Sequence, residues 1–493
     1  MRADVCLILE GSYPYITGGV SSWVHQLVTA LSEVNFALVT LLPDEHYPRL
    51  DKYQLPPNIV SRQDIFLFGG TVDTGVRREA RADLVAAMQD LHESDNASRC
   101  PFMRTIDRLL RSGKHSAVTL MTARSSWRLL RHLYDSRGRR VSFLDYFWTW
   151  RSIHGPMFHL FDVPLPEAAV YHPISTGYAG FLGALAKMRT GGGMMLTEHG
   201  LYTREREIEI AHADWIYEEP PDGTAYAAHE AFFKTWWRSQ YRFLGQMTYD
   251  MADRIITLHE PNRKLQIAAG ASADKLQIVP NGIRIDPALI QARLREGDWS
   301  ARPFRIALIG RVVPIKDIKT YLRAVQLASQ QVPIEAYVMG PLDEDPDYHA
   351  ECIALVEMLG ISGTVTFTGM VSVKEWLPRL DLNVLTSVSE SQPLVILEAA
   401  SAGVPSVSTD VGCCRELLEG MAGEDAALGA SGVITPVASP DRTAAAIVAL
   451  ARDPARHAAM MKAGLQRVEA YYKLDDVWAA YRKLYANVAG KGA

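Results

Sequence analysis

Short apolar runs alternate with amphipathic stretches along most of the chain. The apolar runs are rich in β-branched residues and are bounded by Gly, Pro or Asn, which is typical of buried parallel strands. The expected strands are Val5–Leu9, Phe36–Leu42, Ala169–His172, Met194–Thr197, Ile255–Leu258, Gln277–Val279, Arg305–Gly310, Glu335–Gly340, Val365–Gly369, Leu380–Thr386, Pro405–Thr409 and Gly432–Thr435. One stretch between them has the spacing of a buried helix face: Val20, Trp23, Val24, Leu27, Val28 and Leu31. This alternation predicts α/β domains with doubly wound parallel sheets that helices cover on both faces.

The alternation is interrupted once, between about residues 75 and 161. This stretch is helical in pattern, rich in Arg, and contains Trp127, Trp148 and Trp150. We expect it to be a helical insertion in the first domain. Residues 215–224 are predicted to form an exposed loop, and the polar segment 286–303 is the predicted linker between the two strand series.

The two strand series predict two Rossmann-like domains that face each other across a cleft. Residues 1–285 are expected to form the first domain, and residues 286–470 the second. A last helical segment, residues 471–493, follows them. Because ligands of such sheets bind at the carboxyl ends of the strands, the functional residues are expected there.

The composition excludes some classes of protein. The chain has 493 residues, of which 48% are hydrophobic and 22% are charged, so it is neither disordered nor fibrous. Its 51 Lys and Arg against 56 Asp and Glu give a net charge of -5, which argues against a nucleic-acid binder. An anionic ligand would therefore need a local cluster of cations.

The cysteines and the apolar runs indicate a cytoplasmic protein. The five cysteines include no Cys-x-x-Cys and none at zinc-ligand spacing, which favours free thiols, a reducing compartment and no bound metal. The run Val5–Leu9 is too short for a signal peptide. The longest weakly charged stretch, 171–185, is shorter than the about 20 residues of a membrane span.

Two glycines, Gly18 and Gly19, stand where the first strand gives way to the first helix. Glycine lets the backbone approach a ligand closely, and a helix N-terminus offers N–H groups to an anion. The spacing differs from Gly-x-Gly-x-x-Gly, so a nicotinamide or flavin site is not indicated. A phosphate site and a simple tight turn both remain open.

Two cations follow the strand Arg305–Gly310. Arg311 can chelate two phosphate oxygens, and Lys316, just before the next helix, can act as a point charge. The alternative is a solvated Arg and a Lys paired with Asp317. A Lys at a helix N-terminus opposes the helix dipole, which favours the diphosphate site.

Residues 387–398 form the most informative segment. They follow the strand Leu380–Thr386, and Pro393 suits the first position of a helix. The helix start around Pro393 and Leu394 then offers the amides near Gln392 to Val395 to an anion. Glu390 lies in the loop, and Glu398 lies roughly 7–8 Å along the helix. Two carboxylates at this separation can hold different hydroxyl groups of one extended ligand.

Two histidines end strands in the first domain. His199 lies beside Glu198 and is followed by the charged run Arg204–Glu207, which a core would not accept, so His199 is a candidate to contact a reacting sugar. His172 is interpreted as a structural strand-end histidine with satisfied hydrogen bonds. Asn281 and Gly282 are interpreted as a structural turn with a possible ligand contact.

Taken together, these residues resemble the retaining GT-B glycosyltransferases of family 4. The ordered set spans nearly the whole chain: Gly18-Gly19, Thr197-Glu198-His199-Gly200, Val279-Pro280-Asn281-Gly282, Gly310-Arg311 with Lys316, Glu390-x7-Glu398, Gly403-Val404-Pro405 and Thr409-Asp410-Val411-Gly412. The opening Leu9-Glu10-Gly11-Ser12-Tyr13-Pro14, with Glu198–Arg206 and the insertion, is most similar to the cytoplasmic glycosyltransferases of bacterial Pel exopolysaccharide synthesis. One departure is Cys413-Cys414, where many relatives carry a second Gly.

The resemblance implies a role for each motif. Arg311 and Lys316 would stabilise a departing diphosphate in place of a metal, Glu398 would bind ribose hydroxyls, and Glu390 would hold the transferred sugar. The amides at Gly19 and around Pro393 would contact phosphate and sugar, and His199 would lie near the anomeric centre. The last helical segment resembles a crossover that packs back on the first domain.

The resemblance also implies the partners. The donor would be a UDP-sugar, no further cofactor would be needed, and the acceptor would be a growing polysaccharide, with an inner-membrane synthase complex as a possible partner. Two alternatives come from other classes: a non-catalytic GT-B scaffold subunit of a membrane synthase, and a nucleotide-sugar epimerase.

Overall fold

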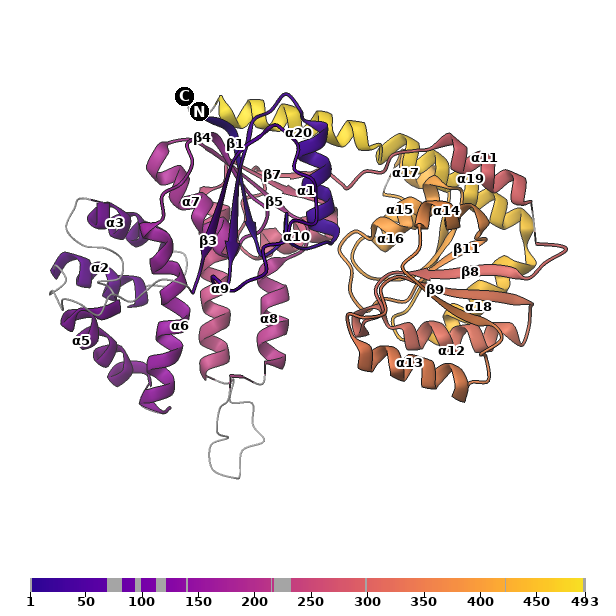
Figure 1. The fold of residues 1–493 in the computed structure, drawn as a ribbon, viewed down its shortest axis with the longest axis horizontal. Coiled ribbons are helices and arrows are strands. Elements are labelled where there is room, and N and C mark those ends of the chain that lie inside the picture. The colour runs from indigo at the N-terminus through magenta and orange to yellow at the C-terminus, as the bar shows by residue number, and fades with distance from the viewer. Residues whose placement is uncertain are drawn as a thin grey trace. The chain divides into compact units, whose positions relative to one another are not determined.

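The computed structural model describes residues 2–68, 82–93, 99–111, 121–138, 141–213, 215–216, 232–297, 299–421 and 423–490. The chain divides into two compact units, each built on one parallel sheet (Figure 1). Unit 1 comprises Met1–Thr257, Arg263–Ile278 and Tyr481–Ala493, and unit 2 comprises Leu258–Asn262 and Val279–Ala480. The predicted α/β class with two Rossmann-like domains is confirmed.

Unit 1 holds a seven-stranded parallel sheet in the order β3-β2-β1-β4-β5-β6-β7. Its strands are β1 (Ala3–Glu10), β2 (Phe36–Leu42), β3 (Ile59–Phe66), β4 (Ala168–Pro173), β5 (Gly193–Glu198), β6 (Arg254–Thr257) and β7 (Leu276–Ile278). Six of them were predicted from apolar runs. The sequence missed β3, because this edge strand carries the polar stretch Ser61–Asp64 and has only one fully buried residue, Ile65.

Helices cover both faces of this sheet. They are α1 (Gly19–Ala30), α7 (Tyr178–Thr190), α8 (Tyr202–His212), α9 (Phe232–Met251), α10 (Glu260–Ala268) and the end of α20 (Leu474–Ala489). On one face, Cys6 and Ile8 of β1 share a core cluster with Phe181 of α7. On the other face, Trp23 of α1 meets Tyr481 of α20, with ring centroids 5.2 Å apart.

Every element that the structure describes between β3 and β4 is helical. These elements are α2 (Ala82–Glu93), α3 (Arg99–Arg111), α5 (Arg124–Leu133), a π-helical turn (Tyr134–Gly138) and α6 (Phe143–Asp162). Part of the predicted insertion, including residues 75–81, lies outside the described residues, as do residues 217–224 of the predicted exposed loop. In Figure 1, α5 lies on the side of α6 away from the sheet.

Unit 2 holds a six-stranded parallel sheet in the order β10-β9-β8-β11-β12-β13. Its strands are β8 (Phe304–Ile309), β9 (Ile334–Met339), β10 (Val365–Gly369), β11 (Leu382–Leu385), β12 (Ser406–Thr409) and β13 (Gly432–Thr435). All six were predicted, with ends that differ by at most one residue except at the start of β11, which differs by two. Its helices are α11 (Pro287–Glu296), α12 (Ile318–Ser329), α13 (Pro346–Met358), α14 (Val373–Trp376), α15 (Leu394–Ser401), α16 (Cys414–Glu419), α17 (Glu424–Ala427), α18 (Pro440–Arg452), α19 (Pro454–Tyr471) and the start of α20.

The polar segment predicted as a linker is instead part of unit 2. Asp286 caps helix α11 by accepting a hydrogen bond from the Ala288 amide at 3.0 Å. On the buried side of α11, Arg293 pairs with Asp381 at 2.9 Å, and both side chains are buried. The prediction was wrong because the partner that buries this polar helix lies 88 residues away.

The last helix, α20, contributes to both units. Its residues up to Ala480 belong to unit 2, and those from Tyr481 belong to unit 1. In unit 1, the hydroxyl of Tyr485 lies 2.8 Å from His172 Nδ1, and a Cβ added to Gly193 would meet Val488 at 2.5 Å. Among the described residues, no helix is long and apolar enough to cross a membrane.

Candidate functional site

The strand order of unit 2 marks where a ligand is expected. From β8 the chain builds outward through β9 and β10, and then returns to the other side of β8 with β11. The carboxyl ends of β8 and β11 therefore flank the topological switch point, where ligands of such sheets bind. The loops that follow these two strands, residues 310–317 and 386–393, carry half of the predicted site residues.

These two loops are hydrogen-bonded to each other. The Val388 amide donates to the Ile315 carbonyl at 2.9 Å. The Thr386 hydroxyl donates to the carbonyls of Lys316 and Asp317, at 3.1 and 2.9 Å. Asp317 also caps α12 and adopts a left-handed conformation with φ 45°. The backbone that carries Lys316 is thus held from the β11 side.

Lys316 and Glu390 meet at this switch point. The ammonium of Lys316 lies 2.5 Å from Oε1 of Glu390, and both side chains are largely buried, at 19% and 13% exposed. The hydroxyl of Ser387 donates to the same carboxylate oxygen at 2.7 Å. The alternative pairing of Lys316 with Asp317 is therefore wrong. Ser387 lies in the segment 387–398 that the sequence singles out, but its hydrogen bond with Glu390 was not predicted.

Arg311 has a different environment. Its guanidinium pairs with Glu344 at 2.9 Å, and 56% of the side chain is exposed. It shares the loop after β8 with Lys316, but its charge is directed to the carboxylate of a loop that follows β9. The structure thus brings Lys316 and Glu390 together and gives Arg311 a separate, solvent-facing partner.

The helix that follows Glu390 begins one residue later than predicted. Leu394 is the first residue of α15, and Pro393 is the residue that precedes it, with φ −71° and ψ 111°. The side chain of Gln392 is buried and accepts a hydrogen bond from the Asn281 amide at 2.7 Å. The turn at Asn281 thus supports the segment that leads into α15, in agreement with its structural interpretation.

Glu398 lies on α15, one turn from its start. Burial raises the pKa of its carboxyl group. Within the described part of the chain, no hydrogen bond or ion pair engages this carboxylate. A partly buried carboxylate without a protein partner can accept hydrogen bonds from a polyhydroxy ligand.

A glycine fixes the backbone around Glu390. Gly412 has φ 55°, and a Cβ at this position would lie 2.3 Å from the carbonyl oxygens of both Glu390 and Ser391. The next amide, of Cys413, donates to the Ser391 carbonyl at 3.0 Å. Cys413 and Cys414, which depart from the family pattern, are buried in a core cluster. The contact of Gly412 with the Glu390 loop is present despite this departure.

In unit 1, Gly18 and Gly19 have open space around their backbone. Gly18 is the residue before α1 and is extended, with φ 168°. A Cβ added to either glycine would meet no atom within 4 Å, and both residues are exposed. Neither a left-handed φ nor a close protein contact requires glycine at these two positions, and their exposed backbone is accessible to a ligand.

His199 follows β5 and is half-buried. Its ring lies edge-on to Trp23, with centroids 4.6 Å apart. Burial lowers the pKa of its imidazole to about 4, so the ring is neutral at neutral pH. It can therefore donate or accept a hydrogen bond, but it supplies no positive charge.

Two carboxylates that the sequence left unassigned hold the turn that carries His199. Glu198 is buried and accepts hydrogen bonds from the Tyr202 amide at 3.2 Å, the Tyr249 hydroxyl at 2.8 Å and the Gln266 amide group at 2.7 Å. Glu10 accepts from the Tyr202 hydroxyl and from the Tyr178 amide at 3.0 Å. Burial raises the pKa of both carboxyl groups. Glu10 and Glu198 are the last residues of β1 and β5, whose carboxyl ends lie at the same edge of the sheet. This position at the strand ends was the sequence signal that could have identified both carboxylates.

His172 is structural, as predicted. Its two ring nitrogens lie 2.8 Å from the hydroxyls of Tyr485 and Thr197, and it is fully buried. Burial lowers the pKa of its imidazole to about 3.

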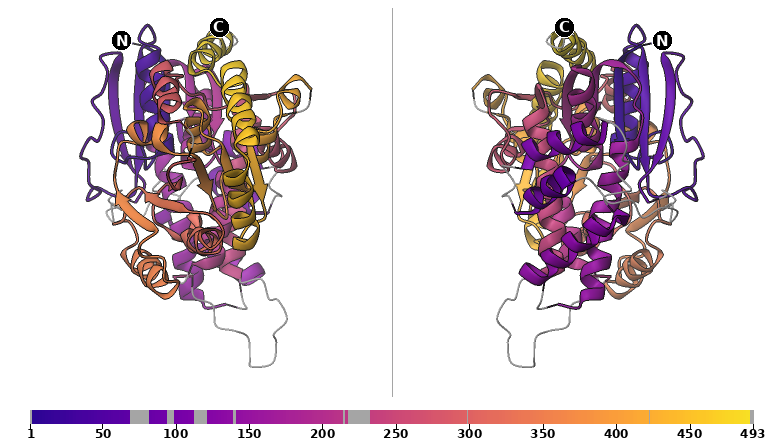
Figure 2. Two further views of the ribbon diagram at one scale, coloured as in Figure 1. Left: turned by 90° about the vertical axis from the view of Figure 1, so that its right-hand side faces the viewer. Right: turned by 90° about the vertical axis from the view of Figure 1, so that its left-hand side faces the viewer.

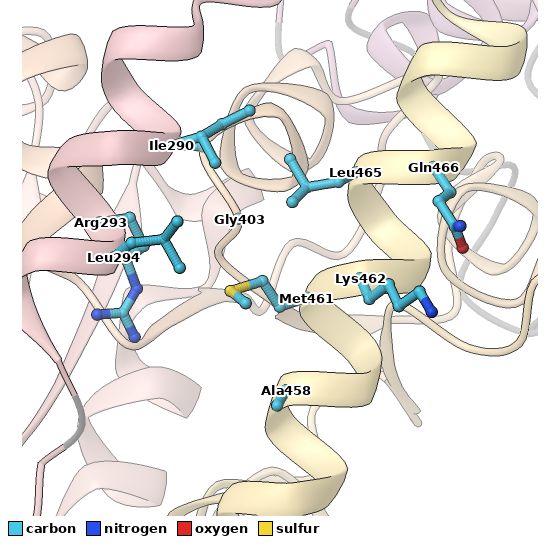
Figure 3. Close-up of a pocket in the computed structure, with 10 residues that line it drawn as sticks. Ile290, Arg293, Leu294, Gly403, Ala458, Met461, Lys462, Leu465 and Gln466 are labelled. Carbon is cyan, nitrogen blue, oxygen red and sulfur yellow. The ribbon is translucent and has the colours of Figure 1, made fainter.

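An apolar cavity of about 510 Å³ lies elsewhere in unit 2 (Figure 3). Ile290 and Leu294 of α11 face Met461 and Leu465 of α19 across it. None of the predicted site residues line it. Its apolar lining does not suit a charged ligand, so the loops at the switch point remain the candidate site.

Comparison with known families decides the family of the chain. A family model described as "Domain of unknown function (DUF3492)" matches residues 3–274, which is more than half of the sequence. The chain belongs to the DUF3492 family. A second model, "Glycosyl transferases group 1", matches residues 303–453 and covers Arg311, Lys316, Glu390 and Glu398. This DUF3492 protein is therefore a glycosyltransferase of the group 1 type.

Individual relatives agree with this assignment. A D-inositol 3-phosphate glycosyltransferase of Kribbella flavida is 24% identical over 347 residues, which are 66% of this chain and 74% of the relative. Among solved structures, Anabaena HepE in complex with UDP has a TM-score of 0.58 at 14% identity, over 98% of this chain and all of HepE. Sucrose-phosphate synthase from Thermosynechococcus elongatus has the same TM-score at 16% identity, over 98% of both chains. At these identities the two structures show the shared GT-B fold.

Proposed function

We propose that this glycosyltransferase transfers a sugar from a UDP-sugar to a growing exopolysaccharide of the Pel type, with retention of anomeric configuration. The observation that carries the proposal is the Lys316–Glu390 pair at the switch point of unit 2, beside the start of α15. HepE, a protein of the same fold, was solved with UDP and with UDP-glucose, which supports UDP as the nucleotide.

Lys316 is proposed to stabilise the diphosphate as it leaves. A Lys ammonium has three N–H donors, so it can bind a phosphate oxygen while it keeps its contact with Glu390. The carboxylate holds the ammonium in place, and a preorganised charge aimed at the leaving group lowers the barrier without a metal. Arg311 is proposed to exchange its exposed Glu344 partner for the second phosphate.

The carboxylates are proposed to bind hydroxyl groups. Glu390 retains acceptor positions beyond those used by Lys316 and Ser387, and these would hold the transferred sugar. Glu398 would hold the ribose, and the backbone N–H groups of Gln392 and Leu394, on either side of Pro393, would contact phosphate. In unit 1, we assign His199, as a neutral imidazole, to a sugar hydroxyl, and the Gly18–Gly19 backbone to a phosphate.

Retention follows if the acceptor attacks from the face that the diphosphate leaves. A phosphate oxygen would then take the proton of the attacking hydroxyl while the bond between the anomeric carbon and the phosphate oxygen breaks. Lys316 would assist this step by neutralising the negative charge that develops on the departing diphosphate.

Titration calorimetry with UDP tests the donor site. We expect Arg311→Ala combined with Lys316→Ala to weaken UDP binding by at least about a hundredfold, since each charge-assisted hydrogen bond contributes about 1.5–3 kcal/mol. Lys319→Ala is the matched control. Lys319 lies on α12, three residues after Lys316, and forms an equally short ion pair, at 2.5 Å, with Glu351 of α13. Equal UDP affinity in the double variant and the control would refute the assignment.

Chromatography of the nucleotide sugars, with mass spectrometry of the products, separates the transferase from its alternatives. With a panel of UDP-sugars and oligosaccharide acceptors, a transferase releases UDP only as the acceptor grows, and Glu390→Gln should abolish that growth. Isomerised UDP-sugar without acceptor would indicate an epimerase. A wild-type protein that leaves every donor unchanged would support the scaffold.

A further inference from the structure

The insertion of unit 1 carries a concentration of positive charge that the donor site does not use. Between residues 99 and 140 the sequence has eleven Lys or Arg and two Asp, whereas the whole chain has a net charge of -5. Much of this charge lies on the exposed sides of α3 and α5. The insertion helices face the viewer in the right-hand panel of Figure 2.

Exposed apolar side chains accompany the charge on α5 and α6. On α5, Arg124, Trp127 and Arg131 follow the spacing of one helix face, and all three are exposed. On α6, Leu144 and Trp148 lie four residues apart on another exposed face. Trp127, Leu144 and Trp148 are 47%, 62% and 54% exposed. These five residues define the α5–α6 face.

The two helices present this face as one surface. The ring of Trp127 packs edge-on against Phe143 and Phe147 of α6, with centroids 5.7 and 6.0 Å apart. Phe147 in turn contacts the ring of Trp148 at 5.2 Å. The opposite sides of the helices, including Leu130 and Trp150, are buried in the core of unit 1.

We propose that the α5–α6 face binds the surface of an anionic lipid bilayer. Arg pairs with lipid phosphates, and Trp and Leu are favoured at the boundary between headgroups and acyl chains. A single exposed apolar residue needs no partner. Trp127, Leu144 and Trp148, however, lie on adjoining helices beside Arg side chains and together form an apolar patch that suits the interface of a membrane. Among the described residues of these helices and their connection, the exposed acidic residues are Asp135, Asp145 and Asp162, and the exposed basic residues are Arg124, Arg128, Arg131 and Arg137, so the positive charge exceeds the negative. The proposal is independent of the donor site.

Sedimentation of the full-length protein with vesicles tests this proposal. We expect the protein to sediment with vesicles of phosphatidylcholine and phosphatidylglycerol, to remain in solution with phosphatidylcholine alone, and to dissociate as salt is raised. Failure to sediment with the anionic vesicles, or equal binding to both compositions, would overturn the proposal.

Two variants locate the binding surface. Arg124→Glu with Arg131→Glu, and separately Trp127→Ser with Trp148→Ser, should each weaken binding to anionic vesicles by at least about tenfold. Arg442→Glu with Arg456→Glu, at exposed positions of unit 2, is the matched charge control and should bind as wild type. Circular dichroism and UDP binding report whether each variant is folded.

Other outcomes contradict the proposal. Vesicle binding that survives either pair of substitutions on the α5–α6 face would place the membrane contact elsewhere. A second such outcome is that the wild-type protein does not bind vesicles, while the same substitutions release a protein that co-purifies with it. In that case the α5–α6 face is a protein interface and the lipid assignment is wrong.

Discussion

Two histidines of unit 1, the buried His172 and the half-buried His199, are kept neutral by their surroundings at neutral pH. Burial lowers the pKa of His172 to about 3 and that of His199 to about 4. A neutral ring serves the two residues differently. His172 uses both nitrogens to hold Tyr485 and Thr197, whereas His199 directly follows β5, at the sheet edge where a ligand is expected.

His172 should make the protein sensitive to acid. Its pKa in the folded protein lies below the about 6.5 of an unfolded chain, so between these values only the unfolded state takes up the proton. The stability that depends on His172 is complete above about pH 6.5 and is lost as the pH falls toward 3. We expect His172→Gln to be less stable than wild type at pH 7 and to lose less stability in acid.

Urea unfolding at a series of pH values measures this effect. The difference in the free energy of unfolding between wild type and His172→Gln should narrow by up to about 1.4 kcal/mol per pH unit below pH 6. A difference that stays constant from pH 7 to pH 4 would contradict a neutral, buried His172.

At the scale of elements, the site depends on loops that fix one another. The loop after β11 is held by the loop after β8 through Val388 and by the segment after β12 through Gly412. Each loop follows a strand end that the sequence predicts well. Their mutual contacts decide whether Glu390 reaches Lys316.

Replacing Gly412 should therefore damage the donor site. In Gly412→Ala the new Cβ would clash with two carbonyl oxygens at 2.3 Å, in addition to the cost of its left-handed backbone. Gly429→Ala is the control, since Gly429 also has a positive φ, 85°, but a Cβ there meets nothing within 4 Å. We expect the control to lose only the about 1–2 kcal/mol of a left-handed non-glycine residue and to bind UDP normally.

Urea unfolding and UDP calorimetry distinguish the two glycine variants. Gly412→Ala should lose more stability than Gly429→Ala and should bind UDP more weakly. If the two variants match in both measurements, the contact of Gly412 with the Glu390 loop does not support the site.

At the scale of the whole molecule, α20 contributes residues to both units. The buried residues that it adds to unit 1 include Tyr481, Leu484, Tyr485 and Val488. They pack beside β2, β4 and β5, as the contacts of Phe36, His172 and Gly193 show. Unit 1 is therefore incomplete without the C-terminal end of the chain.

Truncating these side chains should destabilise unit 1. We expect Leu484→Ala with Val488→Ala to cost about 4 kcal/mol, because both side chains are buried. Lys483→Ala with Asn487→Ala changes exposed positions of the same helix turns and should stay within about 0.5 kcal/mol of wild type. Hydrogen exchange of the β4 and β5 amides measures the effect, and equal exchange in the two variants would contradict it.

The sequence alone determined the parallel strands, the loops that follow them and most of the residues that the loops carry. These are local properties, since apolar runs and turn residues report burial and chain reversal within a few positions. The tertiary structure decided which residues meet. Lys316 pairs with Glu390, 74 residues away, and Glu10 meets Tyr202 across 192 residues. Such pairs depend on strand order and register, which local patterns do not encode. For the same reason, the sequence did not predict that the segment expected as a linker carries helix α11 of unit 2.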